Sequence, residues 1–441
     1  MNLPVNVQEI ITTLENAGFE AYAVGGCVRD TLLNKEPDDW DITTSATPEE
    51  AKALFPRTID TGIQHGTITV LIGKETYEVT TYRIDGEYED SRHPKEVIFT
   101  SNLLEDLKRR DFTINAMAYN DRSGIVDAFG GMQDLENKII RCVGNPTERF
   151  TEDALRMMRA VRFSGQLGYE IEPVTANAVK ELAPTLSRIS AERICTELIK
   201  LMVSNHPEYL QKAYELGMTN VFMPEFDDAM ETTQNNPHHC YSVGEHILHS
   251  LSHVRNDKVL RLTMLFHDLG KARTKTTDEK GIDHFYGHAE VSAQIADDVM
   301  KRLRFDNDTR HKVIKLVKYH DLKMALTPTG VRKAIVKVGE ELFPLLLEVK
   351  RADFLAQSMH KRDEKEAELA EMERLYAQIL EEKNCVSLKT LAVTGSDLIA
   401  AGMKPGKEIG EVIQMLLEIV IEDPESNTKE ILLSKLSPIK K

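Results

Sequence analysis

Apolar residues follow two different rhythms along the 441-residue chain. Up to about residue 140, short runs rich in β-branched residues alternate with helical stretches; the runs are AYAVGG, WDITT, GTITVLI and YEVTTYR, after a first helix VQEIITTLENAGF. From about Thr151 onward, apolar residues recur every three or four positions, as in EDALRMMRAVRFSGQL, ISAERICTELIKLMV and VLRLTMLFHDLGK. The first pattern is typical of strands and the second of amphipathic helices. The chain is therefore predicted to have an α+β fold, with a mixed head and an all-helical remainder.

The length suggests several structural units rather than one core. Two polar stretches indicate breaks in the helical part: DDAMETTQNNPHH, and the charged segment MHKRDEKEAELAEMERLYAQILEEK, which is expected to be a mostly solvated helix with many i,i+4 ion pairs. We predict four domains with these boundaries: a head at 1–140, a helical neck at 141–225, a body at 226–360 and a helical tail at 361–441.

Composition narrows the class of protein. No apolar stretch approaches the roughly 20 residues that span a bilayer, and the first residues do not resemble a signal peptide. Five scattered cysteines without a C-x-x-C spacing argue against a disulfide framework and suit a reducing cytoplasm. We expect a cytoplasmic protein without a membrane partner. The net charge of −16 opposes nucleic-acid binding, but arginines gather near the motifs described next.

A glycine pair follows the first predicted strand. Gly25 and Gly26 allow backbone N–H groups to approach a phosphate, and Arg29 adds positive charge. For the glycine pair alone, a purely structural turn is the alternative.

Asp39 and Asp41 come next, and residues two apart on a strand point to the same face. Two carboxylates on one face are unfavourable unless a cation neutralises them, and Mg²⁺ commonly bridges carboxylates and substrate phosphates. Two such ions could activate a hydroxyl and stabilise a leaving pyrophosphate. Glu78 is a candidate third carboxylate from another strand. A solvated acidic turn that includes Asp38 is the alternative.

These residues resemble the nucleotidyltransferase superfamily that includes DNA polymerase β. The order GGCVRD, DWDITT, RRDFTINAMA (109–118), DAFGG with DL (127–135) and EDALR (152–156) is similar to class II, which contains bacterial CCA-adding tRNA nucleotidyltransferases and poly(A) polymerases. The resemblance covers about residues 15–225. It implies a polymerase-β-like head, with tRNA, CTP and ATP as partners and Mg²⁺ as cofactor. It assigns metal binding and catalysis to Asp39 and Asp41. It assigns nucleotide binding to Gly26, Arg29, Arg110, Asp153, Arg156, Arg159 and Arg162.

Asp153 and Arg156 are predicted to be neighbours, three residues apart on one helix. A carboxylate only accepts hydrogen bonds and a guanidinium only donates them. Cytosine and adenine both present an amino donor beside a ring-nitrogen acceptor, whereas uracil and guanine present the reverse. The pair therefore accepts C and A and leaves unpaired groups against U and G. An amphipathic helix with solvated arginines is the alternative.

Other members of class II remain alternatives. Poly(A) polymerases carry an arginine-rich I-G-R-R-F strand, which the corresponding stretch TGIQHGTITV at 61–70 lacks. CC-adding enzymes tend to lack a flexible loop that this chain has at 83–94. An A-adding enzyme stays open as an alternative to full CCA addition.

The helical half carries a second set of candidate ligands. His246, His267, Asp268 and Asp353 appear in order, with His288 and the pair His320-Asp321 between them; imidazole and carboxylate groups suit a divalent ion. Residues 238–355 resemble the HD phosphohydrolase superfamily. The resemblance implies a divalent metal of unknown identity on the first four residues, and a phosphatase or 2′,3′-cyclic phosphodiesterase activity.

Two alternatives stay open for the activity of this half. A degenerate scaffold is one. An HD phosphohydrolase as the main activity is another, and the intact carboxylate pair counts against it. In the tail, the turn at 404–407 could bind phosphate at a helix start or simply connect two helices. The sequence leaves the oligomeric state open.

Overall fold

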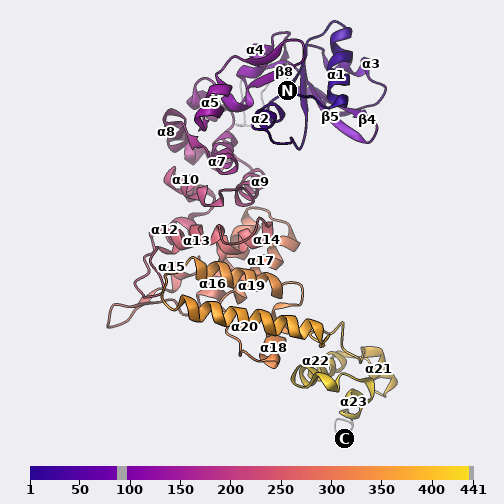
Figure 1. Cartoon of the computed structure of the whole chain (residues 1–441), viewed down its shortest axis with the longest axis vertical. Helices are drawn as coiled ribbons and strands as arrows, with labels where there is room; N and C mark the ends of the chain where they lie inside the picture. Colours follow the sequence, from indigo (N-terminus) through magenta and orange to yellow (C-terminus); the bar gives the residue numbers. More distant parts are fainter. Residues whose placement is uncertain (87–96, 437–441) are drawn as a thin grey trace. The chain divides into compact units, whose positions relative to one another are not determined.

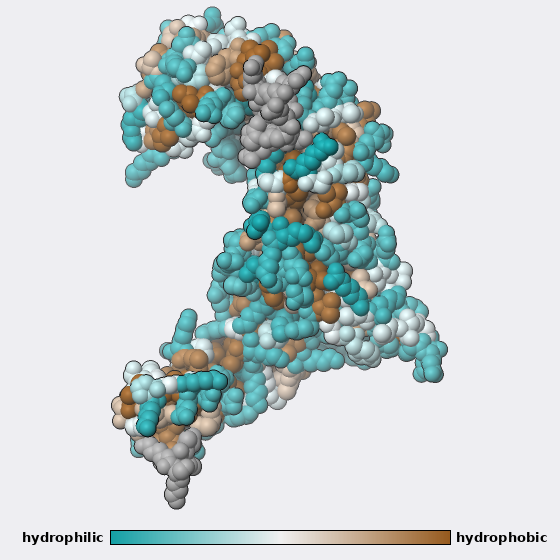
Figure 2. Space-filling view, turned by 180° about the vertical axis from the view of Figure 1, so that it is seen from behind, coloured by the Kyte–Doolittle hydropathy of each residue, from teal (hydrophilic) through white to brown (hydrophobic). Residues whose placement is uncertain are grey.

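A computed structural model describes residues 1–86 and 97–436 of the chain. It divides into two compact units, Met1–Pro224 and Glu225–Lys441. Figure 2 shows hydrophilic residues over most of the visible face of each unit, with smaller hydrophobic patches between them. In the part of the chain that the structure describes, no helix is long and apolar enough to cross a membrane.

The head of unit 1 is built on one sheet of seven strands, in the order β3-β4-β5-β2-β1-β8-β9. Within this sheet β2 and β5 run parallel, and the other neighbouring strands run antiparallel. The strands are β1 Ala21–Val24, β2 Asp41–Thr44, β3 Thr58–Gly62, β4 Thr67–Ile72, β5 Glu75–Thr81, β8 Met117–Asn120 and β9 Gly124–Asp127. All four residues of β1 are buried, as expected for a short apolar run in the interior of a sheet. The four strands read from the sequence are confirmed.

The head helices follow their local signals. In α1 (Val5–Asn16) the four buried residues are Val7, Ile10, Ile11 and Leu14, which recur at helical spacing. The helix α3 (Pro48–Leu54) starts with a capping box between Thr47 and Glu50. It packs against β4 (Figure 1). The other head helices are α2 Gly26–Leu32, α4 Leu103–Lys108 and α5 Gly131–Asn137.

The rest of unit 1 is mainly helical. Its helices are α6 Pro146–Glu152, α7 Leu155–Leu167, α8 Pro173–Leu182, α9 Ala191–Met202, α10 Leu210–Glu215 and α11 Thr219–Phe222. The prediction of one helix across EDALRMMRAVRFSGQL is wrong, because the chain breaks at Asp153, whose φ of −141° is extended rather than helical. A two-stranded pair, β10 (Ile139–Ile140) with β11 (Glu170–Ile171), also interrupts the expected all-helical part.

Unit 2 is a helical assembly around α14 (Lys258–Phe266). All residues of α14 from Leu260 to Phe266 are buried, and the helix packs against α13, α16, α17 and α19. Its other long helices are α13 Val243–Leu251, α16 His288–Arg302, α17 Asn307–Tyr319, α18 Pro328–Val338, α19 Phe343–Leu355, α20 Arg362–Glu381 and α22 Lys407–Glu422. The short elements are α12 Pro224–Glu231, α15 Lys271–Thr274, α21 Gly395–Ala400, α23 Lys429–Ser434 and the hairpin β12 Thr276–Thr277 with β13 Asp283–His284.

Two expectations for this half need correction. The polar stretch predicted as a break is helical up to Glu231, because α12 buries Phe226 and Ala229. The charged helix α20 is mostly solvated, as expected, with Leu369, Leu375 and Ile379 buried where it packs on α18 and α19 (Figure 1), but its ion pair between Arg374 and Glu371 is spaced i,i+3 rather than i,i+4. The four-domain division stays a prediction.

Candidate functional sites

A group of carboxylates stands at the start of β2. Asp41 is the first residue of this strand, and its register partner on the parallel strand β5 is Glu78. Asp39 precedes the strand and is exposed. Burial raises the pKa of Asp41 to about 6, with further contributions from the negative charges of Asp39 and Glu78; Arg110 acts in the opposite direction. Negative charges gathered at one point favour the binding of a cation, which fits a metal site.

The turn at Gly25 and Gly26 lies against the side chain of Arg110. Gly25 has a positive φ of +84°, which side chains rarely adopt. A Cβ added there would lie 2.9 Å from Nη1 of Arg110. The glycine therefore leaves room for the Arg110 guanidinium, next to Gly26, which starts α2.

Arg29 is held inside the head. Its guanidinium donates hydrogen bonds to Asp30 at 2.8 and 2.9 Å and to Oδ1 of Asn115 at 2.7 Å. These bonds occupy both ends of the guanidinium, and the side chain is buried. The contacts make Arg29 a link between α2 and the 109–118 motif. A direct contact with nucleotide stays a prediction.

Arginines converge on a pocket of about 270 Å³ in unit 1. Four of its lining residues, Arg110, Asp153, Arg156 and Arg159, were predicted from the sequence to bind nucleotide. The full lining is Arg109, Arg110, Asp111, Asp153, Leu155, Arg156, Arg159 and Arg193. Five guanidinium groups against two carboxylates make this pocket suited to a polyphosphate.

The geometry around Asp153 differs from the prediction. Asp153 lies in the break between α6 and α7, where its Oδ1 accepts a hydrogen bond from the backbone N–H of Leu155 at 3.0 Å. Its Oδ2 accepts from Nη2 of Arg193 at 2.7 Å. Arg156 is oriented by Oε2 of Glu152 at 2.8 Å and by the carbonyl of Arg109 at 3.0 Å. The two residues line one pocket, but from a loop and a helix rather than from one helix.

Arg159 and Arg162 have different surroundings. Arg159 donates from Nε to Oδ2 of Asp111 at 2.7 Å. Although burial opposes it, this pairing lowers the pKa of Asp111 to about 2. Arg162 is buried and donates to Glu197 at 2.6 Å and to Gln166 at 2.7 Å. It does not line the pocket, so its contact with nucleotide stays a prediction.

Sequence reasoning missed Arg193 and Arg109. Arg193 lies on α9, 40 positions from its partner Asp153, and no short spacing links the two. Arg109 stands in the RRDFTINAMA motif beside Arg110 and could have been found there. The predicted loop at 83–94 begins on β6, Arg83–Asp85, which pairs with β7, Val97–Phe99. Its positions 87–94 lie outside the described residues.

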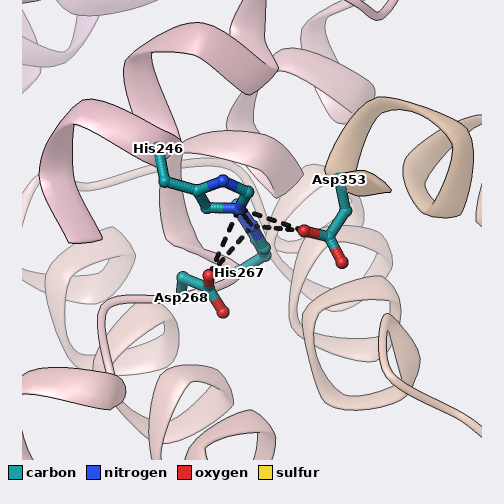
Figure 3. Close-up of side chains that lie close together, drawn as sticks. All are labelled: His246, His267, Asp268 and Asp353. Atoms are coloured by element: carbon teal, nitrogen blue, oxygen red, sulfur yellow. Dashed lines mark hydrogen bonds and ion pairs between the residues drawn. The ribbon is translucent and has the colours of Figure 1, made fainter. Parts of the chain in front are cut away.

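Unit 2 brings its four predicted ligands together (Figure 3). His246 comes from α13, His267 and Asp268 follow α14, and Asp353 comes from α19. Nε2 of His246 lies 3.0 Å from Oδ1 of Asp353, 3.4 Å from Oδ2 of Asp268 and 3.2 Å from Nε2 of His267. One ligand atom from each residue falls within 4.8 Å of all the others. This nitrogen and oxygen set suits a divalent transition metal.

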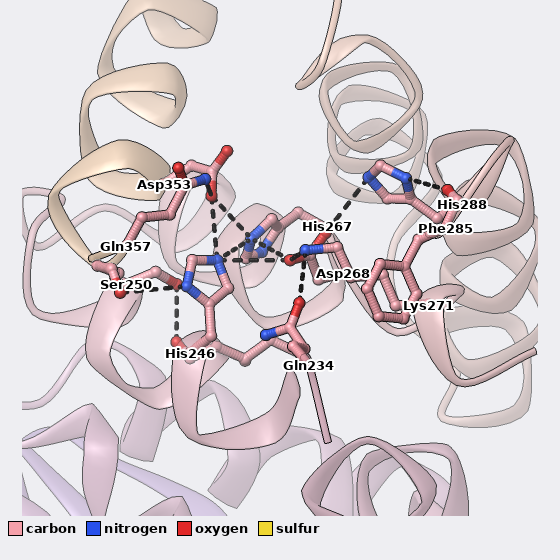
Figure 4. A network of polar contacts seen from close by, with 12 residues as sticks. Gln234, His246, Ser250, His267, Asp268, Lys271, Phe285, His288, Asp353 and Gln357 are labelled. Atoms are coloured by element: carbon pink, nitrogen blue, oxygen red, sulfur yellow. Dashed lines mark hydrogen bonds and ion pairs between the residues drawn. The ribbon is translucent and has the colours of Figure 1, made fainter. Parts of the chain in front are cut away.

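Charges within unit 2 compensate these carboxylates. Burial alone would raise their pKa values. Lys271, with Nζ 2.6 Å from Oδ2 of Asp268, and the neighbouring His267 instead hold the pKa of Asp268 well below its usual range. The neighbouring imidazoles of His246 and His267 do the same for Asp353, again against the effect of burial. Lys271 is itself positioned by Gln234 at 3.1 Å (Figure 4).

The cluster opens onto a pocket of about 1020 Å³. Asp268 and Asp353 line it, together with the ammonium groups of Lys271, Lys350 and Lys365. Burial lowers the pKa of both Lys350 and Lys365. A pocket that combines metal ligands with ammonium groups is suited to an anionic ligand such as a phosphate ester.

Known protein families match successive parts of this chain. Three family models match: "Poly A polymerase head domain" at residues 21–141, "Probable RNA and SrmB- binding site of polymerase A" at 168–230, and "tRNA nucleotidyltransferase domain 2 putative" at 273–436. The CCA-adding enzyme of Lactobacillus helveticus is 37% identical over 97% of this chain and 95% of its own length. That of Streptococcus suis is 35% identical over 98% and 97%. The crystal structure of the Bacillus stearothermophilus CCA-adding enzyme in complex with CTP superposes with a TM-score of 0.75 at 29% identity, covering 100% of this chain and 98% of the other.

Proposed function

We propose a function on the basis that the chain belongs to the family of CCA-adding enzymes. It adds C, C and A to the 3′ end of tRNA from CTP and ATP, without a nucleic-acid template. The enzyme is a nucleotidyltransferase. In each cycle the tRNA 3′-hydroxyl attacks the α-phosphate of the nucleotide, and pyrophosphate leaves. We place the reaction in the cytoplasm, which is supported by five cysteines that form no disulfide within the described residues.

Asp39 and Asp41, with Glu78 beside them, would hold Mg²⁺ in the head. The clustering of these carboxylates supports this: Glu78 is the register partner of Asp41, and the negative charges of Asp39 and Glu78 add to burial in raising the pKa of Asp41 to about 6. When bound, Mg²⁺ supplies positive charge at the transferring phosphate and the attacking oxygen. Arg110, which acts electrostatically on Asp41 and also lines the arginine pocket, would hold the triphosphate next to these carboxylates.

Asp153 and Arg156 would select the base from inside the pocket. Asp153 would accept from the amino group that cytosine and adenine share, and Arg156 would donate to the neighbouring ring nitrogen. Arg193 is a positioning residue in this proposal, because its guanidinium fixes the Asp153 carboxylate. Uracil or guanine would leave both side chains facing groups of the wrong polarity, and buried unpaired groups make such rejection strong.

The single observation that carries this proposal is the meeting of Arg110, Asp153, Arg156 and Arg159 in one pocket next to Asp41. The test is pyrophosphate release from tRNA that lacks its CCA end. With Mg²⁺ present, CTP and ATP together should release pyrophosphate, and UTP and GTP should not. Equal release from all four nucleotides would refute base selection, and no release would refute the activity.

A second function in unit 2 is supported by the four-ligand cluster. We propose a metal-dependent phosphohydrolase, acting as a phosphatase or 2′,3′-cyclic phosphodiesterase, with His246, His267, Asp268 and Asp353 as ligands of a divalent ion. Two observations support it: the ligand atoms lie within a short distance of one another, and the neighbouring pocket is lined by lysine side chains. Elemental analysis of the purified chain and hydrolysis of 2′,3′-cyclic nucleotides with several divalent ions test it. No bound metal together with no hydrolysis would reduce the domain to a scaffold.

A further inference from the structure

The side chain of Phe163 lies at the meeting point of three arginines in unit 1. Phe163 is a buried residue of α7. The guanidinium carbons of Arg29, Arg159 and Arg162 lie 5.1, 5.3 and 3.7 Å from the centre of its ring. Sequence analysis assigned nucleotide binding to all three arginines and gave no role to Phe163.

The three arginines reach this ring from two different elements. Arg159 lies four positions before Phe163 on α7, so the two side chains are neighbours on one face of the helix. Arg162 precedes Phe163 directly, whereas Arg29 comes from α2, next to the glycine turn. Of the three, Arg159 is the one that lines the pocket of about 270 Å³. The ring therefore joins α2 to the helix that carries Arg159 into the pocket.

The charges around the ring call for a neutral anchor. Each arginine is paired with one carboxylate; the pairs are Arg29–Asp30, Arg159–Asp111 and Arg162–Glu197. The face of an aromatic ring carries partial negative charge and attracts cations, and the attraction is stronger where water is excluded. A further carboxylate at this point would also attract the arginines, but it would repel the phosphates of a nucleotide. The Phe163 ring holds the guanidinium groups without adding a negative charge.

A second aromatic ring links Phe163 to the carboxylate partner of Arg159. The rings of Phe112 and Phe163 meet edge to face, with centroids 5.8 Å apart and an interplanar angle of 79°. The backbone N–H of Phe112 donates to Oδ1 of Asp111 at 2.8 Å. Oδ2 of the same carboxylate accepts from Nε of Arg159 at 2.7 Å. Phe163 thus contacts Arg159 and also packs against the residue that orients the Asp111 carboxylate.

We propose that Phe163 is a positioning residue for nucleotide binding, whose ring fixes the Arg159 guanidinium at the pocket. This inference rests on the nucleotidyltransferase function proposed above. Arg29 and Arg162 act on the same ring, which lets them influence the nucleotide from outside the pocket lining. The part of the nucleotide that responds is the triphosphate, because guanidinium groups bind phosphate oxygens. Base selection stays with Asp153 and Arg156.

Fluorinated phenylalanines at position 163 test the role of the ring. One, two or three fluorine atoms weaken the negative face stepwise and change the size of the ring only slightly. In the full-length chain, the Kd for CTP, measured by isothermal titration calorimetry, should rise with each fluorine, up to on the order of 10-fold. The kinetic preference for CTP over UTP should not change. The same series at Phe150, which is fully buried on α6, is the matched control and should leave the Kd unchanged.

A double-mutant cycle tests whether the ring acts through Arg159. Phe163→Leu keeps a buried apolar side chain and should raise the Kd for CTP by about 10-fold in the parent chain. In the Arg159→Ala background the same change should have little further effect. Circular dichroism melting curves show whether each variant is folded, and the fluorinated series decides the question if Phe163→Leu is not.

The outcomes separate this inference from the proposed function. A parent chain that binds CTP with a Kd that stays constant across the fluorinated series overturns the role of the ring and leaves the function in place. Additive effects of Phe163→Leu and Arg159→Ala overturn the action through Arg159. A folded parent chain that does not bind CTP overturns both the function and this inference.

Discussion

Asp41 in unit 1 and Asp268 in unit 2 are both carboxylates in candidate metal sites, yet their pKa values move in opposite directions. Asp41 is partly buried next to Asp39 and Glu78, and its pKa rises to about 6. Asp268 is buried more deeply, but Lys271 and His267 hold its pKa well below the usual range. Burial acts the same way on both residues, so the difference comes from the charges of their neighbours.

This contrast distinguishes two designs. In unit 1 Asp41 has mainly negatively charged neighbours, whereas the five arginines of the adjacent pocket pair with other carboxylates, Asp106, Asp111, Glu152 and Asp153. In unit 2 acidic and basic groups alternate within one buried cluster (Figures 3 and 4), as expected for a site that is assembled before its substrate arrives. The following predictions test this difference, from the largest expected effect to the smallest.

Asp41→Ala should reduce nucleotide addition by on the order of 10³-fold or more, because it removes charge stabilisation from the transferring phosphate. The chain should remain folded, since Asp41 begins β2 and is only partly buried. Single-turnover addition to tRNA with Mg²⁺ measures the effect. Asp38→Ala is the matched control, because Asp38 is exposed in the same segment, and it should keep normal rates. Near-normal turnover of Asp41→Ala would show that the catalytic carboxylates are elsewhere.

His267→Ala should remove metal from unit 2 and abolish hydrolysis of 2′,3′-cyclic nucleotides. A metal present at 100 times its dissociation constant stabilises a protein by about 2.7 kcal/mol. Adding metal should therefore raise the melting temperature of the parent chain but not that of the variant. Nucleotide addition should survive, since the proposed residues for it all lie in unit 1. His311→Ala, which removes an exposed histidine of α17, serves as control. Loss of both activities in a folded His267→Ala chain would contradict the separation of the two sites.

Asp153→Ala should reduce base discrimination by about 1–3 kcal/mol, as for other bidentate base contacts. Triphosphate binding should change less, because the phosphates are assigned to the arginines. The measurement compares kcat/KM for CTP with UTP on tRNA without CCA, and for ATP with GTP on tRNA ending in CC. Glu148→Ala removes an exposed carboxylate on α6 and should leave both ratios unchanged. If KM rose equally for every nucleotide in Asp153→Ala, the residue would be a structural contact.

Asp41→Asn should stabilise the metal-free chain at pH 8. The folded pKa of about 6 lies above the reference value of 3.8, so the folded state loses stability as pH rises from about 4 to 6 and does not regain it above. The full shift would correspond to about 3 kcal/mol, and partial exposure reduces this to about 1 kcal/mol, a few degrees in melting temperature. At pH 4 the variant and parent should melt alike. Asp38→Asn should change neither value, and a stabilisation at pH 4 equal to that at pH 8 would exclude the ionisation of Asp41 as its cause.

Much of the fold could be predicted because its signals are local. The strand β1 is a continuous apolar run, and α1 has buried residues at helical spacing. The strand β3 was missed because most of its side chains are exposed, so that TIDTG shows no apolar alternation. The hairpin of β8 and β9 was missed because MAYN contains no β-branched residue and all four residues of GIVD are only partly buried. Short strands take their stability from sheet neighbours that the local sequence does not reveal.

Sequence motifs could predict which residues belong to the candidate sites. They could not predict which neighbours those residues contact. The apolar spacing continues through Asp153, so the sequence gives no signal for the break between α6 and α7. The Asp153 carboxylate instead accepts a hydrogen bond from the backbone N–H of Leu155, the first residue of α7. Arg162 is held by Glu197, 35 positions away, a partner that no short spacing indicates; its contact with nucleotide stays a prediction. In unit 2 the four expected ligands do come together, whereas the approach of His288 and His320 to Asp268 depends on the packing of α16 and α17.

The most direct test of templateless CCA synthesis uses three tRNA transcripts, ending before the CCA, after C, and after CC. Each is incubated with the wild-type chain and each nucleoside triphosphate separately, and the 3′ ends are sequenced. We predict C on the first two transcripts, A on the third, and no incorporation of U or G. Addition of A to the CC end alone would instead identify an A-adding enzyme, and long A tails on every transcript would identify a poly(A) polymerase; either result would contradict the complete reaction proposed here.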